Sequence, residues 1–306
     1  MANRAAFGDL LEPGMRKIFD DRLQAQPTQY EKVFNVLTST KQDETDSSVS
    51  GFGQFTETSE DGTLTYEDPL QGYDVSYVHK SWKKGFKVTE EMYEDDQYNV
   101  MQKMPSKLAV SASRTVETQA AKTLINAFSG SYLGGDGKAL CASDHPRSDG
   151  GTAQDNATVA VLAESALKEL SLLMRGTLDD KGQLVLVSPN RLIVPPALED
   201  TAKVLLQSTG RPYNATTIFT NDINPYKDKY ELLVWDYLSA AAGGSDTAWY
   251  LQDTALHELN FFWRKRPVFE QDNSFTTDEA LFKGKMRFSN GWSDWRGFGG
   301  STGAGA

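Results

Sequence analysis

The hydrophobic positions near the start of the sequence recur with the spacing of an α-helix. Residues 12–24 place four apolar side chains on one helical face, and a second apolar cluster follows in residues 29–37. The face consists of Met15, Ile18, Phe19 and Leu23, and the cluster of Tyr30, Val33, Phe34, Val36 and Leu37. The polar segment Ser39–Ser50 comes next and is typical of a loosely held strap. The pattern therefore predicts an arm with two apolar patches over residues 1–50.

The stretch FTETSEDGTLTYED, residues 55–68, predicts a β-hairpin. Asp61-Gly62 is a strong two-residue turn signal, and the threonines around it favour strands. Phe55, Leu64 and Tyr66 are its only large apolar residues. A two-stranded hairpin is marginal in water unless an apolar face packs on something. We therefore expect the hairpin, and the arm before it, to find their partners on other copies of the chain.

A long apolar stripe farther along the chain predicts a helix over residues 104–130. Pro105 marks its start, Ser106 is the expected N-cap and Gly130 the expected end. The stripe consists of Leu108, Ala112, Val116, Ala120, Leu124 and Phe128. Two further helices are predicted over 156–176 and 197–209, and a buried strand at 184–189 (LVLVSP) is followed by a bridging segment. Further strands are predicted within 215–222, 229–238 and 248–253, and two alternating strand segments within 259–271 and 281–295. A loose glycine-rich tail is predicted from residue 296.

Composition and charge narrow the class of protein. A hydrophobic content of 39% with 24% charged residues describes a soluble globular chain, and no apolar run is long enough to cross a membrane. The start lacks the pattern of a signal peptide, and a single cysteine excludes an internal disulfide, so we expect folding in a reducing cytoplasm. The net charge of −11 argues against a basic groove that holds nucleic acid.

The charge is distributed in blocks around the predicted hairpin. Residues 51–79 contain six acidic residues and neither lysine nor arginine, whereas the next eight residues, KSWKKGFK, contain four lysines. Such blocks usually form solvated faces. They would also allow the acidic hairpin of one copy to meet basic surface on another, where complementary charge fixes the register.

No constellation of residues predicts a catalytic, cofactor or metal site. Cys141 and His145 lie close in sequence, but a thiolate nucleophile also needs an orienting group, and Asp144 adds no second ligand pair for zinc. GGDGKAL, residues 134–140, lacks the spacer and the Ser/Thr of a phosphate loop. Asp253 and Glu258 could act as the paired acids of a glycosidase, yet nothing in the sequence fixes their separation.

The order of these parts resembles the major capsid proteins of tailed phages, an α+β fold first described for the Hong Kong 97 phage. The likeness is carried by FDDRLQAQPTQYEKVFNVLTST in the arm, EEMYEDD before the long helix and GDGKALCASDHPRSDGG after it, and it is strongest to the Mu-type major head subunits. The resemblance implies an N-terminal arm (1–50), an extended β-hairpin loop (51–85), a peripheral domain with its spine helix (86–185), an axial domain (186–258) and a return to the peripheral domain with a C-terminal tail (259–306).

The resemblance also implies a function. The chain would be a structural protein without enzymatic activity that self-assembles, as pentamers and hexamers, into an icosahedral virion shell around double-stranded DNA. Its expected partners are portal and scaffolding proteins, an optional decoration protein, and packaged DNA contacted only non-specifically. Assembly would take place in the host bacterial cytoplasm, without a membrane. Two alternatives stay open: an encapsulin-like compartment, and a cytosolic hydrolase that uses Cys141 and His145 or an acid pair.

One departure from some relatives bears on how the shell is held. Those relatives link subunits covalently through a lysine of the extended loop and an asparagine of a neighbour. Residues 51–79 contain neither residue type. We therefore expect a shell held by non-covalent contacts.

Overall fold

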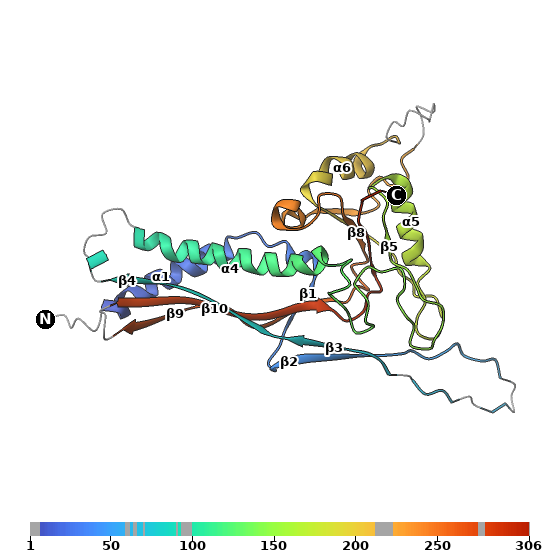
Figure 1. The fold of residues 1–306 in the computed structure, drawn as a ribbon, viewed down its shortest axis with the longest axis horizontal. Coiled ribbons are helices and arrows are strands. Elements are labelled where there is room, and N and C mark those ends of the chain that lie inside the picture. Colours follow the sequence, from blue (N-terminus) through green and yellow to red (C-terminus); the bar gives the residue numbers. More distant parts are fainter. Residues whose placement is uncertain are drawn as a thin grey trace. The chain divides into compact units, whose positions relative to one another are not determined.

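The chain divides into two compact units, each made of segments that are separate in sequence. The computed structural model describes residues 7–58, 62–63, 66–69, 71–89, 91–92, 100–211, 223–274 and 279–305 (Figure 1). The first unit comprises Met1–Glu44, Tyr77–Ala120 and Phe261–Asn290, and the second comprises Thr45–Ser76, Ala121–Asn260 and Gly291–Ala306. All five junctions fall inside elements: β2 (Asp43–Val49), β3 (Gln71–Val78), α4 (Val100–Ile125), β9 (Leu259–Ser274) and β10 (Glu279–Trp292).

The first unit is built on a four-stranded sheet in the order β1-β9-β10-β4, with β1 at Asn35–Thr38 and β4 at Lys80–Thr89. Strands β10 and β4 pair antiparallel, from Glu279 opposite Thr89 to Phe288 opposite Lys80. Alternate residues of β10 are buried, as expected for a sheet with one covered face. Helices α1 (Phe7–Gln24) and α4 pack on this face (Figure 1). Their shared core consists of Met15, Phe19, Val88, Met101, Leu108, Ala109, Phe269, Ala280 and Phe282.

The N-terminal segment folds within its own chain, contrary to the expectation drawn from its sparse apolar residues. Met15 and Phe19 of α1 are buried in the core of the first unit, on the predicted helical face. Tyr30 and Val33 lie in the short helix α2 (Tyr30–Val33) and are buried as well. The segment expected to be a loose strap contains strand β2, which pairs with β3. The sheet and α4 of the same chain supply the apolar partners of Met15 and Phe19.

Helix α4 begins at Val100 and ends at Ile125, so the start inferred from Pro105 and the end inferred from Gly130 are both wrong. Pro105 is buried inside the helix, and Ser106 is an interior residue rather than its N-cap. A proline removes one backbone hydrogen bond, but core contacts of Met101 before it and Leu108 after it hold the helix on both sides. Four of the six residues of the predicted stripe, Leu108, Val116, Ala120 and Leu124, are buried. Ala112 is half-buried, and Phe128 lies beyond the end of the helix.

The second unit contains a five-stranded sheet in the order β5-β11-β8-β6-β7. Strand β8 pairs antiparallel with both neighbours, whereas β11 with β5 and β6 with β7 are parallel. The strands are β5 (Ala157–Thr158), β6 (Arg191–Val194), β7 (Glu231–Val234), β8 (Trp249–Gln252) and β11 (Phe298–Ser301). Helices α5 (Glu164–Arg175) and α6 (Glu199–Gln207) share its apolar core, and α6 follows a 3₁₀ turn at Pro196–Leu198 (Figure 1).

Three sequence-based elements of this unit need correction. The segment LVLVSP is not a buried strand, since Leu184 and Leu186 are exposed and the strand is β6, in the segment taken as a bridge. The second helix begins at Glu164, eight residues later than predicted from Asn156. The glycine-rich tail contains β11, whose four residues are all buried.

The structure contains a pair of strands in this region, but the strands lie on either side of the predicted stretch. The paired strands are β2 and β3, which flank the quoted stretch, and the described residues between them form no strand. Asp61 of the predicted turn, the predicted strand over 215–222 and most of EEMYEDD lie outside the described residues. No helix in the described part of the chain is long and apolar enough to cross a membrane.

Candidate functional site

The segment between β2 and β3 leaves large aromatic side chains in solvent. Phe52, Phe55 and Tyr66 are 64%, 106% and 88% exposed. Residues 51–58 and 66–69 run as a long loop beyond the two strands (Figure 1). Burial of a Phe or Tyr ring stabilises a protein by about 2 kcal/mol. The exposed rings of this segment do not gain that stabilisation within the chain. We call residues 50–69 the extended segment.

A turn at residues 177–184 contacts the extended segment near both of its ends. Lys181 Nζ lies 2.6 Å from Glu67 Oε1, and Glu67 Oε2 accepts a 2.7 Å hydrogen bond from the backbone N–H of Gly53. Gln183 Nε2 donates to the carbonyl of Phe52 at 3.2 Å. The Lys181 ammonium and the Gly53 amide lower the pKa of Glu67. Both sides of the extended segment are thus tied to one turn, which we call the clasp.

Two further contacts fix β3 near its exit from the extended segment. Ser48 Oγ of β2 accepts from the N–H of Tyr73 at 2.8 Å and donates to the carbonyl of Tyr73 at 3.2 Å. Gly135 lies against β3 so closely that a Cβ there would meet the carbonyl oxygen of Asp74 and a methyl of Val75, each at 2.9 Å. Only glycine permits this approach. The strands that carry the extended segment are therefore held along their length.

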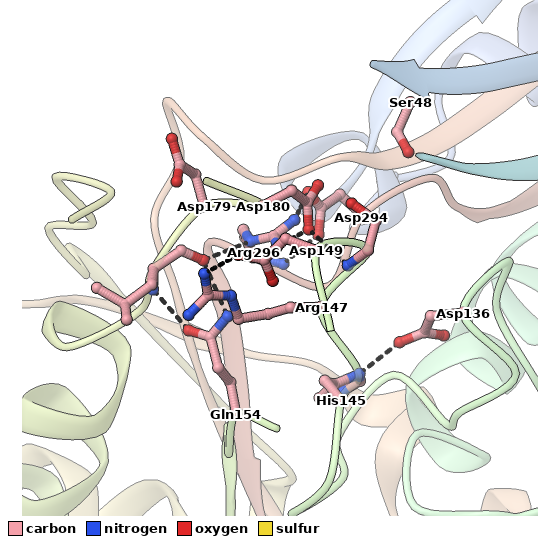
Figure 2. Close-up of polar contacts among 12 residues, drawn as sticks. Ser48, Asp136, His145, Arg147, Asp149, Gln154, Asp179, Asp180, Asp294 and Arg296 are labelled. Carbon is pink, nitrogen blue, oxygen red and sulfur yellow. Dashed lines mark hydrogen bonds and ion pairs between the residues drawn. The ribbon is translucent and has the colours of Figure 1, made fainter. Parts of the chain in front are cut away.

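A half-buried polar cluster contacts the clasp at Leu178 and Asp180 (Figure 2). The guanidinium of Arg296 lies 3.0 Å from Asp180 and 2.8 Å from Asp294, and it donates to the carbonyl of Leu178 at 3.1 Å. Gln154 exchanges two hydrogen bonds with the backbone of Leu178. Burial alone would lower the pKa of Arg296, but the two carboxylates outweigh it and raise that pKa. The guanidinium is held by two carboxylates and a carbonyl, so the cluster is a structural support.

Cys141 and His145 belong to the same unit but form no nucleophile and base pair. Cys141 is fully buried, and this burial raises the pKa of its thiol far above the usual range. His145 is also buried and stacks on Trp295 with ring centres 4.2 Å apart. Its Nδ1 lies 2.6 Å from Asp136 Oδ2 (Figure 2). Its Nε2 lies 3.1 Å from Asn156 Oδ1. Both ring nitrogens are engaged by these oxygens, which leaves neither one for the thiol.

The other residues weighed from the sequence have local structural roles. Asp144 forms an ion pair with Lys138, and among the described residues no group of three His, Cys, Asp or Glu side chains could hold a metal ion. Asp253 accepts hydrogen bonds from the backbone N–H groups of Ser188 and Ala255. Burial raises the pKa of Glu258. The contacts of Asp144 and Asp253 hold loops in place.

Sequence reasoning missed the clasp. Asp179, Lys181 and Gly182 have the composition of a turn, and Gly182 adopts a φ of 78°. That signal predicts the turn itself, but not that Lys181 would meet Glu67, 114 residues earlier in the chain (181 − 67).

Comparison with protein families gave one match that spans most of the chain. A family model described as "Phage capsid protein" matches residues 72–299. No curated protein sequence matches the chain.

Several solved capsid structures have a similar fold at low sequence identity. The procapsid protein of bacteriophage JBD30 is 18% identical with a TM-score of 0.52, and the match covers 96% of this chain and 74% of that one. The capsid protein of the native GTA particle is 12% identical with a TM-score of 0.57 and 90% coverage of both chains. A virus-like particle from Pyrococcus furiosus is 12% identical with a TM-score of 0.54, covering 94% of this chain and 98% of that one.

Proposed function

Since this chain belongs to the phage capsid protein family and is a structural major capsid protein with a Hong Kong 97-type fold, we propose that its copies close into an icosahedral shell around double-stranded DNA. Pentamers and hexamers would be the repeating units, because one contact repeated around an axis closes a ring. Portal and scaffolding proteins, with an optional decoration protein, would complete the particle. Assembly would take place in the host cytoplasm.

The observation that carries this proposal is the extended segment. Its rings at Phe55 and Tyr66 are almost fully exposed, yet the clasp holds its base in a defined place. A monomeric enzyme gains nothing from exposed aromatic side chains on a held loop, whereas aromatic anchors are typical of protein interfaces. We infer that a second copy of the chain covers these rings.

Charge supplies a complementary surface for the segment. The edge strand β4 of the first unit exposes four lysines, and one of them, Lys87, lies 2.6 Å from Glu279. Lys80, Lys83 and Lys84 are also exposed. An acidic segment from a neighbouring copy would meet opposite charge along this edge, which favours one register.

The five-part division inferred from the resemblance becomes a proposal about roles in the shell. The extended loop (51–85) would lie on a neighbour, α4 would be the spine of the peripheral domain (86–185), and residues 186–258 would form the axial domain near the symmetry axes. The arm (1–50) would add intersubunit contacts outside its buried faces, and residues 259–306 would return to the peripheral domain. No enzymatic step is part of this function.

Sedimentation of the purified full chain tests the shell. We expect megadalton particles that appear as uniform closed shells in negative-stain images. A wild-type preparation that contains only small oligomers under all assembly conditions would refute the proposal.

A pair of variants tests the extended segment separately. Phe55→Ser/Tyr66→Ser should leave the fold intact, because both rings are exposed, but should prevent assembly. The matched control is Tyr132→Ser/Leu133→Ser, two residues of the same unit that are 45% and 54% exposed and lie outside the segment. Normal particles from the first pair would show that the segment is not an interface.

A further inference from the structure

The exposed residues of α4 carry one sign of charge. From Lys103 onward, the side chains that face solvent fully are Lys103, Lys107, Arg114 and Lys122. The single acidic residue of the helix, Glu117, is buried and accepts hydrogen bonds from the backbone N–H groups of Gln29 and Tyr30. A chain with a net charge of −11 thus presents a purely basic face along this helix.

A groove in the first unit runs beside this face, lined by eight residues of α4 and by Arg22 of α1. Its volume is about 610 Å³. Three cations line it: Arg22 from α1, and Lys107 and Arg114 from α4. The groove's lining contains no acidic residue, and no ion pair in the described part of the chain involves these three side chains. The three positive charges are therefore available to a ligand.

Besides the cations, several residues of the lining carry hydroxyl groups. They are Ser106, Ser111, Thr115 and Thr118, of which Thr115 donates its hydroxyl to the carbonyl of Ser111 at 2.8 Å, and Val110 is the only apolar residue type among those that line the groove. Arginine, lysine and hydroxyl side chains together are the usual partners of nucleic-acid phosphates. A protein partner would need apolar or aromatic anchors at the centre of its interface, and this groove offers almost none.

The spacing of the cations also suits a polyanion. Lys107 and Arg114 are seven residues apart in the helix, which separates them by about 10 Å along its axis. A DNA strand presents a phosphate about every 3.4 Å along the duplex axis, so the two side chains reach phosphates a few steps apart. We propose that the groove between α1 and α4 binds the phosphate backbone of double-stranded DNA, without reading its sequence. The net charge of −11 argued against a groove of this kind, but a charge summed over the whole chain does not exclude a local basic face. The proposal rests on the shell function for the source of the DNA: the groove would face the enclosed duplex.

Binding of a fluorescently labelled duplex of mixed sequence to the purified full chain, followed by anisotropy from 50 to 200 mM salt, tests this. In Lys107→Gln/Arg114→Gln the slope of log K against log salt should shrink by about 1.8, because each lost phosphate contact contributes about 0.9. Affinity at 50 mM salt should fall at least about tenfold, equally for duplexes of different sequence.

The matched control is Lys168→Gln/Arg175→Gln on α5. It also removes one lysine and one arginine, seven residues apart and exposed. The control should bind duplex DNA like the wild type. Equal losses in both variants, or an unchanged slope in the α4 variant, would overturn the proposal.

Two further measurements distinguish DNA binding in the groove from peptide binding and from a defect in assembly. If the α4 variant keeps its affinity for DNA but loses affinity for a peptide of residues 55–68, the groove accepts the acidic segment of another copy and the DNA proposal fails. Particle formation is measured in parallel by sedimentation, and the α4 variant should still assemble. DNA binding by the free chain can be scored even if no particles form, so failure of the shell and failure of the groove are distinguishable.

Discussion

At the scale of single residues, Cys141 illustrates how burial removes a reactive group from use. Its sulfur would lie 3.0 Å from a Cβ added at Gly300, and the neighbouring ring of Tyr250 is buried too. We expect iodoacetamide to leave Cys141 unmodified in the native chain at pH 8, because burial disfavours the thiolate that reacts. Modification within minutes, measured by mass spectrometry, would contradict the structure. Chain unfolded in urea is the positive control.

His257 makes the second unit sensitive to acid. Burial, followed by the charge of Arg191, lowers the pKa of His257 to about 4, and Nδ1 accepts a 3.3 Å hydrogen bond from the N–H of Leu259. As the pH falls below about 6.5 the unfolded chain binds the proton first. The stability present above that pH is therefore lost between pH 6.5 and 4, by up to about 3 kcal/mol.

The measurement is the free energy of unfolding of the unassembled chain across this pH range. His257→Asn keeps an acceptor for Leu259 but cannot be protonated, so its stability should fall less steeply than that of the wild type between pH 6.5 and 4. Identical pH dependence of the two proteins would rule out this role for His257.

Sequence reasoning at this scale could identify Cys141 and His145 as the residues to test, but not their surroundings. Reactivity depends on what lies around the thiol, and here Tyr250 and Gly300 come from distant parts of the chain. His145 is engaged by Asp136 and Asn156, both on the same loop system. Such partners follow from tertiary packing, which the spacing of residues along the chain does not encode.

At the scale of elements, one buried carboxylate joins two helices of the first unit. Glu117 of α4 accepts from the N–H of Gln29 at 2.7 Å and of Tyr30 at 3.3 Å, at the start of α2. Glu117→Leu would leave two donors without this acceptor and should lower the free energy of unfolding by about 2–3 kcal/mol. Urea titration measures the loss. Glu117→Gln retains an acceptor oxygen and should recover part of it, and equal losses would contradict the capping role.

The sequence predicts elements best where apolar spacing is regular. The stripe of α4 and the alternation of β9 and β10 are recovered because one face of each is buried. Single residues that usually mark the end of a helix are misleading here. Pro105 lies within α4, where core contacts hold the helix on both sides. The glycines of β11 resemble a tail, yet a Cβ at Gly300 would approach Tyr250 to 2.8 Å, so close packing excludes larger residues there.

At the scale of the whole molecule, the shell is expected to be held without covalent links. Residues 51–79 contain no lysine or asparagine that could form an isopeptide bond, and Lys80, Lys83 and Lys84 at the end of the loop lie in strand β4. In mature particles boiled in detergent, the capsid protein should therefore run as a single band at 33.8 kDa on a denaturing gel. A ladder of multiples of that mass would disprove it. Intact particles loaded without boiling serve as the control for assembly.

The fold class and the family were predictable from the order of elements, but the partners of the arm were not. The arm has few apolar residues, and counting them led to the expectation that it stands outside the chain's own core. Met15 and Phe19 are nevertheless buried in the first unit, because α4 and the sheet provide apolar surface that is distant in sequence. The extended segment is different, since its described aromatic side chains stay exposed.

Because the two compact units are interleaved in sequence, recombination between related genes affects both of them. Each unit is assembled from three separate stretches of the chain, and every junction lies inside a strand or helix. A single crossover between related genes would therefore bring together mismatched pieces of both units. A single crossover cannot replace one unit and leave the other intact, so we expect the sequences of the two units to evolve together.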